Sequence, residues 1–171
     1  MMDLVSAIER SLSTQNWYSA LALSLMLPDI CGALAGKPYG GKQYVEWFDE
    51  YLLEKYQDSL SGKDCYALRC SFPHEGADGI EKQRVRETLD KFAFIPQRSH
   101  CCKIARSQVG DPKYDNKAIL QLSVDQFCRD LVDGTKRWLN DHGDSDVARN
   151  NLHDLLKIHE GGVHIGGIFI Q

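Results

Sequence analysis

Residues 17–34 read WYSALALSLMLPDICGAL and carry the strongest structural signal in the chain. Asp29 is the single charged residue in this stretch. Apolar residues cover most of the circumference of the helix that it would form, which is typical of an element buried on all sides. Pro28-Asp29 and the recurring polar residues favour a core helix over a membrane span. Pro28 is expected to kink this helix, because its ring removes a backbone donor.

Further helices are predicted on both sides of this segment. Apolar residues at helical spacing predict a short helix over the first dozen residues, with capping groups from Ser13-Thr14-Gln15-Asn16. After a Gly- and Pro-containing loop, residues 42–56 carry an apolar stripe that is expected to pack in the core. The stripe consists of Tyr44, Trp47, Phe48, Tyr51 and Leu52.

The remaining helical patterns are shorter. Ser61 begins a fourth helix with Asp64 three residues later, which approximates a capping box, and Gly76 provides a stop. The mixed-charge residues 78–90 are interpreted as a short exposed helix, and residues 125–140 and 145–159 as the last two helices.

The periodicity between these helices changes to that of strands. Residues 92–95, 101–109 and 118–124 are predicted strands, of which the two longer ones pair as a hairpin with a long loop. Residues 163–170 are β-prone and predict one more strand. The fold class is therefore mainly α (α+β): a bundle of five to six helices with a small antiparallel hairpin or sheet inserted at about 92–124, in one domain over residues 1–171.

Composition limits the classes of function. The net charge of -4 argues against broad electrostatic binding of nucleic acid and leaves room only for a local basic patch. The six cysteines do not form a disulfide framework, and His100-Cys101-Cys102 lacks a second pair at metal-ligand spacing. A redox role for Cys101 and Cys102 stays open. The N-terminus has no signal-peptide pattern, so we expect a cytoplasmic protein without a metal, a cofactor or a membrane partner.

The stretch DCYALRCSFPHEG, residues 64–76, is the most informative for chemistry. It places Arg69 and His74 five residues apart near a predicted helix end. Pro73 is expected to stop or bend the helix near Phe72. On an undisturbed helix the two side chains point about 140° apart, so a shared site needs that bend or a second copy of the segment. Histidine moves protons near neutral pH, and arginine offers a planar fork of donors to phosphate oxygens.

This arrangement, an arginine and a histidine separated by four residues and followed by Glu-Gly, resembles the signature of HEPN domains. The segment LRCSFPHEG, residues 68–76, also resembles the corresponding segment in a group of uncharacterised bacterial proteins. The resemblance implies a helical-bundle homodimer that cleaves RNA without metal in a cleft formed by two copies. It implies that Arg69 and His74 are the catalytic pair. Nearby candidates for substrate binding are Cys70, Ser71, Glu75 and Lys63.

A second hypothesis is a non-catalytic helical module that dimerises or binds a protein partner. Arg69 then forms a salt bridge with Asp64, Glu75 or Asp29, and His74 caps carbonyls at the helix end. Loop aromatics such as Tyr39 and Tyr114 are the candidate contacts in that case.

Overall fold

The computed structural model describes residues 1–38, 40–57, 59–104, 112 and 116–170, and within them the chain is mainly helical. The helices are α1 (Met2–Ser13), α2 (Trp17–Leu34), α3 (Gly41–Tyr51), α4 (Leu53–Tyr56), α5 (Gly62–Glu75), α6 (Val124–His142) and α7 (Asp146–His153). The strands are β1 (Lys91–Ile95), β2 (Cys102–Ile104), β3 (Ile119–Ser123), β4 (Val163–Ile165) and β5 (Ile168–Ile170). The predicted fold class, mainly α with a small β component, is confirmed.

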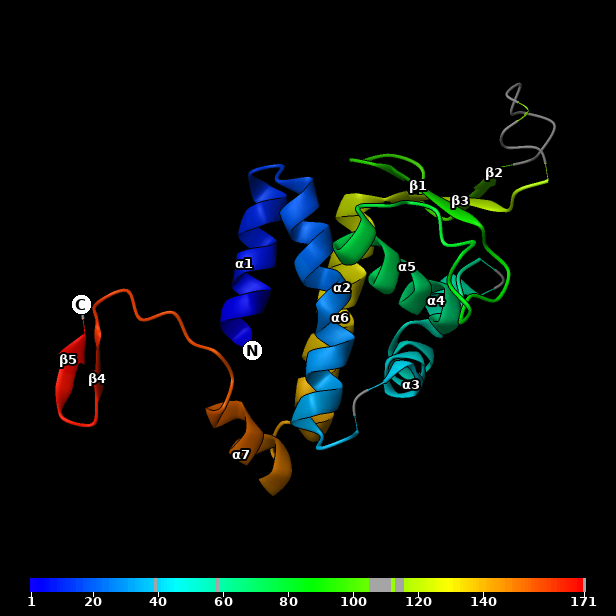
Figure 1. Cartoon of the computed structure of the whole chain (residues 1–171). Coiled ribbons are helices and arrows are strands. Elements are labelled where there is room, and N and C mark those ends of the chain that lie inside the picture. The colour runs from blue at the N-terminus through cyan, green and yellow to red at the C-terminus, as the bar shows by residue number, and fades with distance from the viewer. Residues whose placement is uncertain (39, 58, 105–111, 113–115, 171) are drawn as a thin grey trace.

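The central element is α2, which packs against α1, α3, α5, α6 and α7 (Figure 1). Ten of its 18 residues are buried, on several sides of the helix. Its length and composition are those of a membrane-crossing segment, but its position is that of a core helix in the part of the chain that the structure describes. Pro28 lies inside α2, and the helix continues through it to Leu34.

The aromatic stripe predicted for residues 42–56 is buried as expected, but the helix is interrupted. Leu52 adopts non-helical backbone angles and separates α3 from α4, while its side chain is fully buried. Next to this stripe, Gly134 of α6 allows a close approach of the indole of Trp47. A Cβ atom at Gly134 would lie 2.9 Å from that ring.

The larger sheet has the strand order β1-β3-β2. β2 and β3 pair antiparallel, with Cys102 opposite Gln121, as the predicted hairpin requires. β1 joins the other edge of β3 in parallel, with Phe92 opposite Leu120, which the sequence did not indicate. The end of the strand predicted over 101–109 lies outside the described residues.

Residues 78–90 do not form the helix that their charge pattern predicted. Asp64, buried at the start of α5, accepts hydrogen bonds from the backbone N–H groups of Glu87 (2.7 Å) and Thr88. The segment is thereby tied to α5 in an irregular path of turns, in which the Ile80 N–H donates to the Asp90 carbonyl at 2.8 Å and the Gln83 N–H to the Ile80 carbonyl at 2.9 Å. Among the predicted capping residues 13–16, the hydroxyls of Ser13 and Thr14 donate to the Arg10 carbonyl at the end of α1 (2.8 and 2.9 Å), whereas Asn16 makes no side-chain cap bond to α2.

The C-terminal region differs from expectation as well. α7 ends at His153, six residues earlier than predicted, and the single predicted strand is a two-stranded antiparallel hairpin of β4 and β5. Gly166 and Gly167 have positive φ angles of 57° and 85° and form its turn, which a side chain would disfavour. The hairpin stands apart from the helices (Figure 1).

Candidate functional site

The predicted site lies on α5, which is longer than expected. Its N-terminus is capped as predicted, because Ser61 Oγ accepts a bond from the Asp64 N–H at 3.1 Å. Pro73 does not end the helix near Phe72; the helix continues to Glu75. Pro73 sits in the last turn, where only the Arg69 carbonyl loses its usual donor. Gly76, with φ 63°, is the stop that the sequence predicted, and its N–H bonds to the Phe72 carbonyl.

Arg69 is held by a buried carboxylate from α2. Its Nε atom donates to Asp29 Oδ2 at 2.6 Å, and the two side chains are 22% and 8% exposed. Asp29 is thus the observed partner among the three that the sequence allowed. Burial raises the pKa of Asp29, and the charge and hydrogen bond of Arg69 offset this only in part. Burial lowers the pKa of Arg69, but the charge and hydrogen bond of Asp29 outweigh it, so the net shift is upward.

His74 lies in the last turn of the same helix and is exposed. Because α5 runs unbroken past Phe72, Arg69 and His74 are separated by about 140° around the axis and about 7.5 Å along it. One chain therefore does not aim the guanidinium and the imidazole at a common point. A site that uses both groups together requires a second copy of α5.

The other predicted contact residues have different surroundings. Ser71 is buried and donates to the Gly79 carbonyl at 2.9 Å, so it faces the protein interior. Lys63 forms an exposed ion pair with Glu87 at 3.1 Å. Glu75 is exposed in the last turn, and Cys70 is a half-buried free thiol next to Arg69. Lys63, Cys70 and Glu75 therefore remain accessible, whereas Ser71 does not. Tyr39 and Tyr114 lie outside the described residues.

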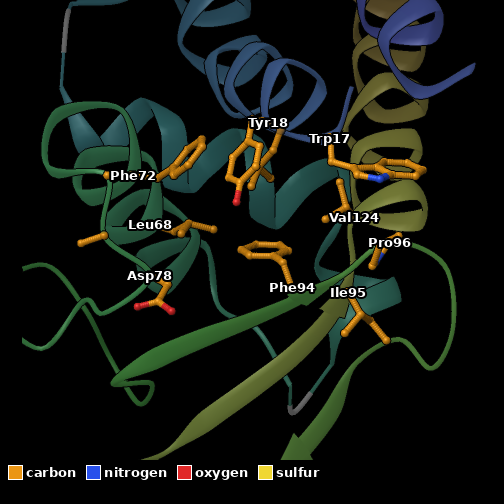
Figure 2. A pocket seen from close by; sticks show the side chains of 12 residues that line it. Trp17, Tyr18, Leu68, Phe72, Asp78, Phe94, Ile95, Pro96 and Val124 are labelled. Carbon is orange, nitrogen blue, oxygen red and sulfur yellow. The ribbon is translucent and has the colours of Figure 1, made fainter. Parts of the chain in front are cut away.

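Two cavities flank the end of α5. One, of about 370 Å³, is apolar and aromatic, and we call it the α5 groove. Figure 2 shows the rings of Tyr18, Phe72 and Phe94 converging there from α2, α5 and β1. The other cavity, of about 400 Å³, is polar, and its lining includes Glu75, Lys82, Lys91 and Lys117. His74 therefore belongs to a helix turn that has an apolar hollow and a polar hollow beside it.

A buried polar network that the sequence did not reveal joins α4, α6 and the segment before β2. Asp130 accepts bonds from Tyr56 Oη (2.9 Å) and Lys55 Nζ (2.5 Å). His100 Nδ1 accepts from the Ser123 N–H at 3.2 Å, so its Nε2 carries the proton of the neutral ring and donates to Tyr56 at 3.1 Å. Burial lowers the pKa of His100, with Asp130 opposing the shift. Its partners lie 23 to 44 residues away in the chain, so spacing alone could not have found them.

Of the residues His100-Cys101-Cys102, His100 belongs to this network, and Cys102 Sγ donates to the His100 carbonyl at 3.7 Å. Over the described residues, no group of three or more His, Cys, Asp or Glu side chains is placed to hold an ion. All six cysteines are free. Burial raises the pKa of Cys101 to about 11 and that of Cys65 to about 12, which keeps these thiols protonated and unreactive at neutral pH.

No family model, curated protein or solved structure matches this chain. The resemblance to HEPN domains therefore rests on residues 69–76.

Proposed function

We propose that this chain is a metal-independent endoribonuclease that acts as a homodimer, with Arg69 as the phosphate-binding group and His74 as the proton-transfer group. The observation that carries the proposal is the way Arg69 is held. The buried carboxylate of Asp29, on α2, holds the guanidinium of Arg69 on α5. The same helix α5 carries the exposed imidazole of His74 in its last turn.

The bond to Asp29 uses one of the five N–H donors of the guanidinium, through Nε. The terminal amino groups can then form the planar pair of bonds that suits a phosphate. Because the side chain is already oriented, little conformational entropy is lost when the phosphate binds. Asp29 is therefore a positioning residue for Arg69.

The reaction follows from these two groups. The imidazole of His74 accepts the proton of a ribose 2′-hydroxyl, and the 2′-oxygen attacks the adjacent phosphorus. The bond to the 5′-oxygen breaks, leaving a 2′,3′-cyclic phosphate and a 5′-hydroxyl. The leaving 5′-oxygen takes its proton from the protonated imidazole of the second copy, and Arg69 stabilises the negative charge that builds up on the phosphate oxygens.

A second copy is needed because Arg69 and His74 point in different directions from α5. Two copies related by a two-fold axis at this helix end bring the imidazole of one subunit toward the guanidinium of the other. The polar cavity that adjoins this end carries three lysines and the three carboxylates of Glu75, Asp78 and Glu81, and Lys91 and Lys117 are paired with Asp78 and Glu81, so the proposal rests on Arg69 and His74 rather than on this cavity. We also infer a cytoplasmic location, since six free thiols persist in a reducing compartment.

A second candidate function is a non-catalytic module for association with a protein partner. It is favoured by the large apolar side chains exposed at the C-terminus, including Leu156 at 92% and Ile158 at 86%. In this interpretation the Asp29–Arg69 pair only joins α2 to α5.

RNA cleavage in EDTA separates the two functions. The substrate is a single-stranded RNA, and the products are tested for a 2′,3′-cyclic phosphate. Replacing His74 with alanine is expected to lower the cleavage rate by about 10²–10⁴-fold. Arg69→Lys keeps the charge but loses the fork, so its rate should fall as well.

The matched control is His153→Ala, which removes another exposed histidine from the last turn of a helix. It should leave the rate unchanged. Cleavage that His74→Ala does not reduce, or no cleavage by the wild-type chain, counts against the enzyme and in favour of the association module.

A further inference from the structure

Residues 154–170, which we call the C-terminal arm, expose an unusual amount of apolar surface. The arm contains the hairpin of β4 and β5 and the segment that leads to it. Its exposed large apolar side chains are Leu156, Ile158, Ile165, Ile168, Phe169 and Ile170. A two-stranded hairpin is marginally stable in water by itself. The arm therefore has the properties of a segment that packs against another surface.

The α5 groove offers a surface of matching chemistry in the same chain. Residues 161–170 of the arm contain no Asp, Glu, Lys or Arg, and the groove lining contains one charged residue, Asp78. Tyr18 is 78% exposed at the rim, although it is a large aromatic residue. Residues 161–170 and this nearly uncharged groove can pack together without burying unpaired charge, while the charged residues of the arm, Asp154, Lys157 and Glu160, lie before the hairpin.

One wall of the groove is the edge strand β1, whose first half is covered by residues 78–79 through an antiparallel bridge between Gly79 and Lys91. β1 is the edge strand of its sheet, and the Phe92 N–H points outward to the Asp78 carbonyl at 2.8 Å. Phe94 and Ile95 follow this covered part of β1, and both line the groove. A strand of the arm can therefore add to this edge while its side chains enter the groove.

We propose that the C-terminal arm of one copy docks into the α5 groove of a second copy, and that the exchange is reciprocal. In Figure 1 the hairpin of the arm lies beyond α1, on the opposite side of the helices from β1, β2 and β3, and the residues that line the groove include none from the described arm. A reciprocal exchange closes as a two-fold dimer and leaves no arm or groove empty.

The numbers of arm and groove residues set an upper limit on the size of this contact. The 17 residues of the arm and the 12 that line the groove give each subunit 29 interface residues. Specific interfaces use roughly 20–30 residues on each side. Phe72 and Gly76 line the groove and flank His74, so a docked arm brings the second subunit to the end of α5. The inference deepens the proposed function, because it names the surfaces that form the dimer, which can assemble whether or not RNA is cleaved.

The test measures the oligomeric state of the full-length chain by sedimentation velocity over a dilution series. The arm variant carries Ile165→Thr and Ile168→Thr, which keep β-branched residues at two paired positions and remove exposed apolar surface. The groove variant is Tyr18→Glu. The control is Val147→Thr, at an exposed position on α7 outside both surfaces.

We expect a wild-type dimer, the same dimer for the control, and a dissociation constant raised about tenfold or more in the arm and groove variants. Circular dichroism confirms that each variant is folded. Mixing the arm variant with the groove variant should produce a heterodimer, because one wild-type arm then meets one wild-type groove.

A wild-type chain that remains monomeric overturns the proposal, whether or not it binds vesicles of neutral phospholipid. So does an arm variant that dimerises like the wild type, or a mixture that forms no heterodimer. The inference rests on the homodimer of the proposed function, so a monomeric wild type overturns both. A dimer that the arm variant does not weaken overturns the arm exchange alone, and a dimer that does not cleave RNA overturns the nuclease alone.

Discussion

Asp29 Oδ2 accepts a 2.6 Å hydrogen bond from Arg69 Nε and so joins the central helix α2 to the helix of the predicted site. The two residues are 40 positions apart in the chain. This one contact has a structural role in every interpretation of the protein and a positioning role if the chain cleaves RNA. The first prediction separates these roles.

Replacing Asp29 with asparagine leaves the Arg69 charge without its partner in a mostly buried place. We expect unfolding in urea to show a loss of about 2–3 kcal/mol, below the usual cost for a broken buried pair because Arg69 is partly exposed. The double variant Asp29→Asn with Arg69→Gln should regain part of that loss. If Asp29 also positions Arg69, Asp29→Asn lowers the RNA cleavage rate at a temperature where it is fully folded. An unchanged rate in folded protein limits Asp29 to a structural role.

Gly76→Ala tests the end of α5. The residue has a φ angle of 63°, and a Cβ atom there would meet nothing within 4 Å, so the cost comes from backbone strain alone. We expect a loss of about 1 kcal/mol in thermal or urea unfolding, and a smaller loss for Gly76→Asn, since asparagine tolerates this conformation better. Equal losses for alanine and asparagine would contradict this explanation.

Gly134→Ala tests the contact between α6 and α3. The added Cβ would lie 2.9 Å from the rigid, buried indole of Trp47. Although alanine favours helix more than glycine does, we expect a net loss of about 1–3 kcal/mol from overpacking. Gly161→Ala is the control, because a Cβ there meets nothing within 4 Å and its φ angle is not positive. Stabilisation by Gly134→Ala would show that α6 moves away at little cost.

The network around His100 predicts how stability depends on pH. Burial lowers the pKa of His100 in the folded protein below the ordinary 6.5, so the unfolded chain binds a proton more readily. The contribution of His100 is complete above pH 6.5 and is lost as the pH falls through 6.5 toward the folded pKa. Unfolding free energies measured from pH 7.5 to pH 5.5 should therefore decrease for the wild type.

His100→Asn removes the titrating group and should flatten this decrease, although its stability at pH 7.5 is lower. His153→Ala, at an exposed position, should keep the wild-type slope. A His100→Asn variant with the wild-type slope would assign the pH dependence to other groups.

Local patterns were sufficient for much of the helical structure. The apolar run of residues 17–34 predicted both the bounds of α2 and its central position. The spacing of Tyr44, Trp47, Phe48 and Tyr51 predicted a buried helix face, and Ser61 and Gly76 predicted the two ends of α5. Each of these signals lies within a few turns of one helix, because side-chain periodicity and capping groups act over that distance.

Contacts between distant segments settled the rest. Pro73 near a helix end predicted a stop, yet the packed helix accepts the ring in its last turn. The irregular path of residues 78–90 depends on the buried carboxylate of Asp64, and the parallel pairing of β1 depends on β3.

Amino-acid order alone determined that this chain buries an apolar helix, surrounds it with amphipathic ones, and carries Arg69 and His74 on one of them. Tertiary structure alone decided that Arg69 meets Asp29, that His100 joins Tyr56 and Asp130, and that the hairpin of β4 and β5 stands apart from the helices. The physical reason is that periodicity specifies which face of an element is buried. The partner that this face meets depends on how all the elements pack together.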